Sequence, residues 1–95
     1  MRYLGVIEKV TRSRKLLLKM EVPLIRDLKE TPVLLENGKF VGVVKDVIGP
    51  VHSPFLLIKP VVSLEEAQRL VGEKIYSVSR GEWRALSRKL KKNPS

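Results

Sequence analysis

The alternation of apolar and polar residues along the chain predicts short β-strands joined by tight turns. A first run, residues 2–10, is followed by a polar, basic turn and then by a second run, residues 15–21, which suits an antiparallel hairpin. In the second run we expect Leu16, Leu18 and Met20 to face inward, with Leu17 as the exception. In the first run we expect one face to carry Leu4, Val6 and Val10 and the other to carry Tyr3 and Ile7.

Prolines and glycines mark the connections between the later strands. Pro23 and Pro32 bracket a loop that lacks a backbone donor at each end, and further strands are predicted at 33–36, 40–48, 55–59 and 73–79. The pair Asn37-Gly38 predicts a hairpin turn in which both residues adopt a positive φ. Gly49-Pro50 ends the strand at 40–48, and Pro54 ends the short connection that follows it.

Two helices are expected among and after the strands. Ser63 is a predicted N-cap with Glu66 completing a capping box, and Gly72 stands where a C′ glycine belongs. A terminal helix is predicted from Gly81 to about Lys92, with basic residues around a narrow apolar face formed by Trp83, Leu86 and Leu90.

These elements together predict an all-β fold, a small six-stranded antiparallel barrel with one short internal helix and a basic C-terminal helix. Closing the sheet into a barrel removes the exposed edges that an open sheet of this size would carry. We expect residues 1–80 to form the barrel domain and residues 81–95 to form a basic helix or tail.

Positive charge is concentrated at the two ends of the chain. The net charge is +9, and residues 1–20 and 80–95 each hold six basic residues against one acidic residue, while the middle is nearly neutral. A polyanion or an acidic protein surface is the natural neighbour of such segments. Aromatic residues do not interleave with the basic ones, so an RNA contact would be to phosphates. The candidate contacts are Arg12, Arg14, Lys15, Arg84, Arg88, Lys91 and Lys92.

The residues needed for catalysis or for metal binding are scarce. The chain has no cysteine, and His52 is its single histidine. Asp27 and Asp46 lie beside turns, where a short carboxylate commonly accepts backbone N–H bonds. We therefore expect no catalytic site, no metal site and no cofactor, and a protein that is not an enzyme.

Apolar residues are in surplus on the strands at 40–48 and 55–59, where both faces carry large apolar side chains. A strand of a small barrel needs only its inward face apolar, so the outward groups require a cover. One interpretation is that a helix of the same chain covers them. The other is a protein-docking face centred on the Gly49-Pro50 and Pro54 connections.

The central segment resembles the core of the GAR protein family, subunits of H/ACA ribonucleoproteins. The resemblance rests on the block Asp46-Val47-Ile48-Gly49-Pro50-Val51, on Pro54-Phe55, and on Lys59-Pro60 at fixed spacing. Ile48 and Phe55 replace an aromatic residue and a tyrosine that are usual in the family, and both keep bulk. The Gly/Arg-rich tails of eukaryotic members are absent, which resembles the archaeal form.

The resemblance implies a barrel of the translation-factor type and a non-catalytic role in rRNA pseudouridylation. The implied partner is the catalytic domain of a dyskerin-type pseudouridine synthase, in an H/ACA guide-RNA particle whose RNA is contacted mostly indirectly. By influencing a mobile loop of the synthase, the subunit would assist substrate RNA loading and product release. The implied partner-binding residues are Val47, Ile48, Gly49, Pro50, Val51, Pro54 and Phe55.

Two other classes of function compete with this one. A stand-alone RNA-binding barrel, acting in ribosome assembly or translation, would use the basic terminal segments. A membrane-surface protein would use the terminal helix, but that helix offers few groups for insertion. With no signal peptide or membrane span evident in the sequence, we expect no membrane contact and a cytoplasmic location in an archaeal cell. An orphaned docking face would also allow weak homodimerisation of the isolated protein.

Overall fold

The computed structural model describes residues 1–24, 27–79 and 81–85. A short helical segment occupies residues 81–85. The remaining elements, in chain order, are β1 (Arg2–Val10), β2 (Leu16–Met20), β3 (Pro32–Leu35), β4 (Phe40–Ile48), β5 (Phe55–Pro60), α1 (Leu64–Arg69) and β6 (Lys74–Ser77).

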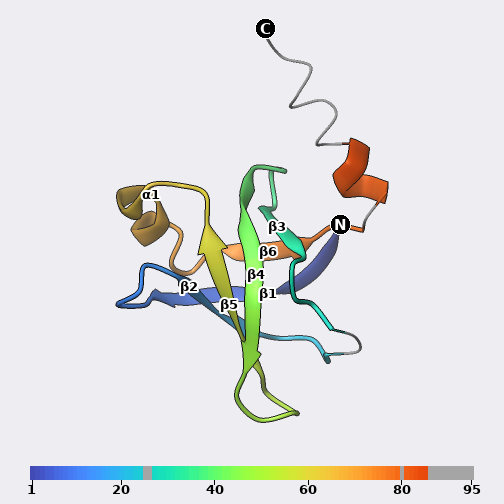
Figure 1. Ribbon diagram of the computed structural model, residues 1–95, viewed down its shortest axis with the longest axis horizontal. Coiled ribbons are helices and arrows are strands. Elements are labelled where there is room, and N and C mark those ends of the chain that lie inside the picture. The colour runs from blue at the N-terminus through green and yellow to red at the C-terminus, as the bar shows by residue number, and fades with distance from the viewer. Residues whose placement is uncertain (25–26, 80, 86–95) are drawn as a thin grey trace, which may run out of the picture.

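The six strands close into a barrel in the order β1-β2-β5-β4-β3-β6, and each neighbouring pair is antiparallel (Figure 1). The predicted small all-β barrel is therefore confirmed. The strand β4 lies as predicted, whereas β6 is shorter than the predicted run at 73–79. No helix in the described part of the chain is long and apolar enough to span a membrane.

The barrel interior is filled by aliphatic side chains from all six strands. Leu16, Leu18 and Met20 of β2 point inward as predicted. Ala67 of α1 and Leu28 of the β2–β3 loop join the same core. Each fully buried leucine or isoleucine contributes about 1.5–3 kcal/mol of transfer free energy, so this core is the main source of stability.

The predicted faces of the first strand are wrong, because β1 contains bulges on both of its edges. Its register shifts between Ile7 and Lys9 against β2, and between Tyr3 and Gly5 against β6. Each bulge adds a residue and reverses the inward–outward alternation beyond it. As a result Leu4 and Ile7, which simple alternation separates, are both buried in the core.

The turn between β3 and β4 also differs from its prediction. Gly38 has a φ of 91°, but Asn37 does not adopt a positive φ. The Gly38 N–H donates to the Leu35 carbonyl at 2.9 Å, and the Leu35 N–H donates to the Lys39 carbonyl at 2.9 Å. This is the longer hairpin loop, in which one left-handed glycine forms a bulge.

The predicted N-cap of α1 is confirmed, whereas the capping box is only half formed. Ser63 Oγ accepts a hydrogen bond from the Glu66 N–H at 3.2 Å. The Glu66 carboxylate instead pairs with the Lys39 ammonium. The C-cap is Leu70, so Gly72, with a φ of 92°, lies one position beyond the expected C′ site.

Candidate protein-docking site

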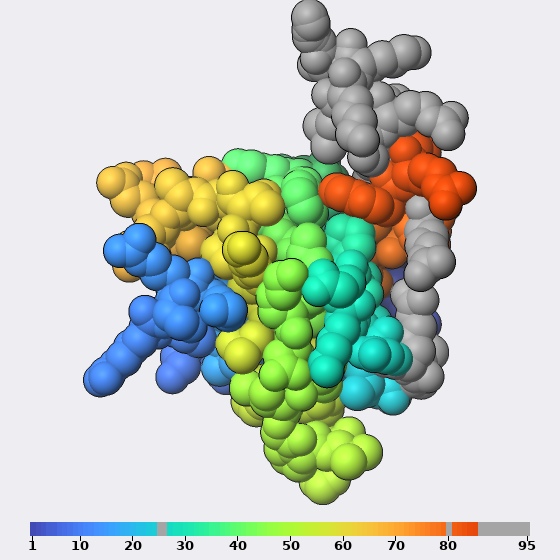
Figure 2. Space-filling model, viewed as in Figure 1, coloured from blue at the N-terminus to red at the C-terminus, as the bar shows by residue number. Residues whose placement is uncertain are grey.

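The hairpin formed by β4 and β5 extends past the body of the barrel. Its connecting loop, coloured yellow-green, protrudes at the end opposite the helical segment 81–85 (Figures 1 and 2). Val51 at this loop is 88% exposed, and Ile48 at the end of β4 is 38% exposed. Two large aliphatic groups are thus presented to solvent on a projecting element.

The loop is held in place by backbone interactions. Ile48 pairs with Phe55 across the end of the hairpin. The Ser53 N–H donates to the Pro50 carbonyl at 3.1 Å, and the Met20 N–H of β2 donates to the Pro54 carbonyl at 3.2 Å. These bonds tie the base of the loop to the barrel, so its apolar residues are presented from a fixed support.

Gly49 is required by its backbone. Its φ of 90° is a conformation that side chains with a Cβ rarely adopt. An added Cβ would also lie 3.4 Å from the ring of Phe55. The residue after it, Pro50, fixes the direction in which the chain leaves the strand.

The seven residues implied by the family resemblance lie together on this hairpin end, but they differ in exposure. Pro54 is buried and supports the loop, while Val47 and Phe55 are half-buried. The exposed members are Ile48, Gly49, Pro50 and Val51. In the free protein an apolar partner would therefore meet Ile48 and Val51 first.

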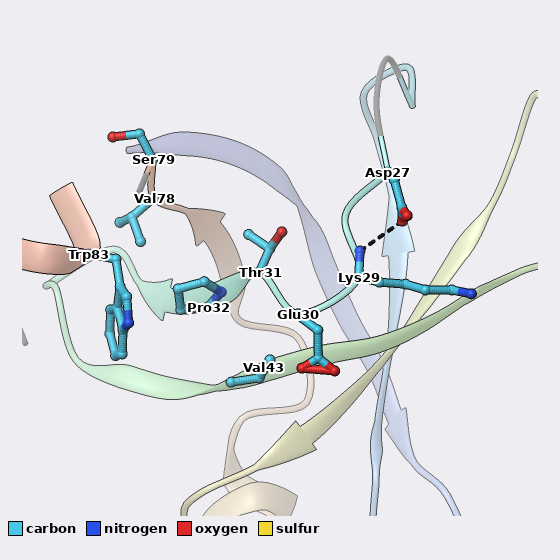
Figure 3. A pocket seen from close by; sticks show the side chains of 9 residues that line it. All are labelled: Asp27, Lys29, Glu30, Thr31, Pro32, Val43, Val78, Ser79 and Trp83. Atoms are coloured by element: carbon cyan, nitrogen blue, oxygen red, sulfur yellow. Dashed lines mark hydrogen bonds between the residues drawn. The ribbon is translucent and has the colours of Figure 1, made fainter. Parts of the chain in front are cut away.

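The opposite end of β4 is covered by the chain itself. The rings of Phe40 and Trp83 lie with their centroids 4.7 Å apart at an interplanar angle of 47°. Trp83 also lies beside Pro32 and Val43 in a hollow of about 350 Å³ (Figure 3). At this end of β4 the chain therefore covers an apolar side chain itself. The docking interpretation applies to the other end, where Ile48 and Val51 are exposed.

The helical segment that carries Trp83 begins with a complete capping box. Ser79 Oγ accepts from the Glu82 N–H at 3.1 Å, and a Glu82 carboxylate oxygen accepts from the Ser79 N–H at 2.8 Å. The amino group of Met1 donates to the other Glu82 carboxylate oxygen at 2.9 Å. These bonds lower the pKa of Glu82 to about 2. The largest cause is the hydrogen bond from the Ser79 backbone N–H, and the next is the bond from the Met1 amino group.

The basic residues predicted as contacts divide into two groups in the structure. Arg12, Arg14 and Lys15 lie in the β1–β2 turn region, and Arg84 is exposed on the helical segment 81–85. Arg88, Lys91 and Lys92 lie outside the described residues.

The structure adds two lysines that sequence reasoning missed. Lys45 of β4 and Lys59 of β5 line a hollow of about 590 Å³ together with Arg14 and Lys15. The spacing of residues in the sequence does not predict this cluster, because its members come together only when the barrel closes and β5 lies beside β2. The cluster joins residues more than forty positions apart.

Both aspartates accept backbone N–H bonds as predicted, although Asp46 lies within β4, at its bulge against β5, and not beside a turn. Asp27 accepts the Lys29 N–H at 3.0 Å, and Asp46 accepts the Val47 N–H at 2.8 Å. Among the described residues, no three or more histidine, cysteine or acidic side chains are grouped to hold a metal ion. Elsewhere, the pKa of Tyr3 is raised to about 12, mainly because its hydroxyl donates a hydrogen bond to the Glu21 carboxylate and secondly because of desolvation.

No family model matches the chain. The chain is 38% identical over 47 residues to an uncharacterized protein of the archaeon Methanothermobacter thermautotrophicus. The matched segment covers 47% of this chain and 51% of that protein, so the match spans about half the length of the relative.

Proposed function

We propose that this protein is a non-catalytic accessory subunit of an H/ACA-type guide-RNA ribonucleoprotein. It docks on the catalytic domain of a dyskerin-type pseudouridine synthase and assists substrate RNA loading and product release. The observation that supports this most directly is the projecting hairpin end, where Val51 is 88% exposed beside Ile48. That loop is also the segment whose sequence resembles the GAR family most closely.

The loop has the properties of an interface anchor. It presents aliphatic side chains on a loop whose base is hydrogen-bonded to the barrel, and pre-organised apolar anchors bind with little loss of conformational entropy. In the described part of the chain, the segment that covers outward apolar groups lies at the other end of β4, beside Phe40. The middle of the chain, which contains this loop, carries almost no net charge, and such a segment suits a protein partner better than RNA.

The test is co-purification with an archaeal dyskerin-type synthase, without RNA and at about 0.5 M salt, where exposed charge contacts are largely screened. The unsubstituted protein is expected to form a stable complex. Ile48→Glu and Val51→Glu should abolish it, because each places a charge in a desolvated apolar contact. Circular dichroism should show that both variants keep the barrel.

The matched control is Val71→Glu, which places the same charge on another exposed valine, 46% exposed and distant in sequence from the loop. This variant should bind the synthase as the unsubstituted protein does. If Val51→Glu still binds the synthase, the interface lies elsewhere on the protein. Absence of any complex, with tight binding to RNA alone at low salt, would favour a stand-alone RNA-binding barrel.

A further inference from the structure

The hollow beside the β1–β2 turn is lined by both basic and apolar side chains. Arg14 and Lys15 line it from the turn, and Lys45 and Lys59 line it from two further strands. Its apolar lining residues are Pro60, Val62, Leu64 and Ala67. In Figure 1 this turn and α1 lie on the same side of the barrel, away from the projecting β4–β5 loop.

The positive charge in this hollow is only partly neutralised. Lys45 Nζ lies 3.1 Å from a Glu30 carboxylate oxygen, and both side chains of this ion pair are exposed. Within the described residues, no ion pair involves Arg14, Lys15 or Lys59. The glutamates of α1 are engaged outside the hollow, with Arg69 and with Lys39. Among the described residues, an anion entering the hollow would meet three cations, Arg14, Lys15 and Lys59, that are in no ion pair.

The turn that carries Arg14 has a strained backbone and is closed by hydrogen bonds to Thr11. Arg14 has a φ of 63°, a position that favours glycine, yet the chain holds an arginine there. The Arg14 N–H donates to the Thr11 carbonyl at 3.0 Å, and the Lys15 N–H donates to Thr11 Oγ1 at 3.1 Å. Strain retained at an exposed position points to a use for the side chain.

We propose that this hollow binds the sugar–phosphate backbone of RNA. The charge extends beyond it along the same hairpin, at Lys9, Arg12 and Lys19, and this favours a long polyanion over a short acidic peptide segment. Phosphates would contact the cations, and riboses would lie against the apolar lining residues. Because none of the described lining residues is aromatic, bases are not stacked and binding is independent of sequence.

This site is separate from the docking loop, so it is tested without the synthase. The probe is a fluorescein-labelled oligouridylate of about 12 nucleotides, titrated by anisotropy at several salt concentrations. Arg14→Gly and Lys59→Ala should each weaken binding about three- to tenfold at low salt. Each should also reduce the slope of log K against log salt by about 0.7, the share of one phosphate on a single strand.

Arg14→Gly carries a second readout, because glycine relieves the left-handed backbone. Its melting temperature should rise while its RNA affinity falls, which a merely unfolded variant would not show. The control is Lys29→Ala, which removes one charge from an exposed lysine that lines the other hollow, beside Trp83. Equal losses in Lys29→Ala and Lys59→Ala would overturn the proposal, since they would indicate non-specific attraction. Equally tight, Arg14-dependent binding of a polyglutamate peptide would also overturn it, in favour of an acidic protein partner.

Discussion

At the residue scale, the barrel depends on two glycines at which neighbouring strands approach closely. A Cβ added to Gly42 of β4 would lie 2.2 Å from the Lys59 carbonyl oxygen of β5. A Cβ added to Gly5 of β1 would lie 2.1 Å from the Lys19 carbonyl oxygen of β2. Both obstacles are backbone atoms in a hydrogen-bonded ladder, so they cannot move aside as a flexible side chain would.

Gly42→Ala should therefore lower the free energy of unfolding by about 3 kcal/mol or more, because β4 and β5 must separate to admit the methyl group. Urea denaturation followed by circular dichroism measures the change. The matched control is Gly81→Ala on the helical segment, where the nearest atom to the added Cβ is 4.0 Å away. That variant should be neutral or slightly stabilised, since alanine favours helix. Equal stability of Gly42→Ala and the unsubstituted protein would show that the two strands are not packed this tightly.

At the element scale, the capping box of the terminal helical segment gives a pH-dependent contact. The pKa of Glu82 is lowered from 4.5 to about 2, so its ionised form is the one that the folded protein favours. A lowered pKa contributes stability that is present above the ordinary value and is lost as the pH falls toward the folded value. The window for this loss is therefore between about pH 4.5 and pH 2.

Acidification through this window should loosen the contact between Trp83 and Phe40. Trp83 is the single tryptophan, so its fluorescence reports on this segment directly. In Glu82→Gln the fluorescence should already resemble the acidic state at neutral pH and change little on titration. The control Glu73→Gln, at an exposed glutamate elsewhere, should titrate as the unsubstituted protein does. An unchanged transition in Glu82→Gln would assign it to another carboxylate.

The elements also show how far sequence patterns reach. Strand positions were predictable because proline, glycine and local alternation fix where each strand begins and ends. The faces of β1 were not, since its bulges arise from pairing with both β2 and β6, strands that local periodicity does not see. The hairpin loop with Gly49-Pro50 could be found from its turn residues, whereas the cluster of Lys45 and Lys59 with Arg14 exists only after barrel closure.

At the scale of the whole molecule, β4 separates two apolar surfaces, of which one is covered by the chain and the other is exposed. At one end Trp83 packs on Phe40, and at the other Ile48 and Val51 are exposed. A barrel with its own core does not need the helical segment in order to close, because the six strands form a complete ladder. The two ends of β4 should therefore respond independently to substitution.

Trp83→Ala is the substitution that tests this independence. It removes a half-buried ring and one aromatic pair, so the free energy of unfolding should fall by about 1–2 kcal/mol while the barrel stays folded. Co-purification with the synthase should be unchanged, since the exposed loop lies at the other end of β4. In the double variant with Val51→Glu, the loss of stability should equal the sum of the two single losses, measured by urea denaturation. Loss of docking in Trp83→Ala alone would extend the interface to the Phe40 end. Collapse of the barrel would instead show that the core requires the helical segment 81–85 as a cover. The docking surface would then consist of the loop alone.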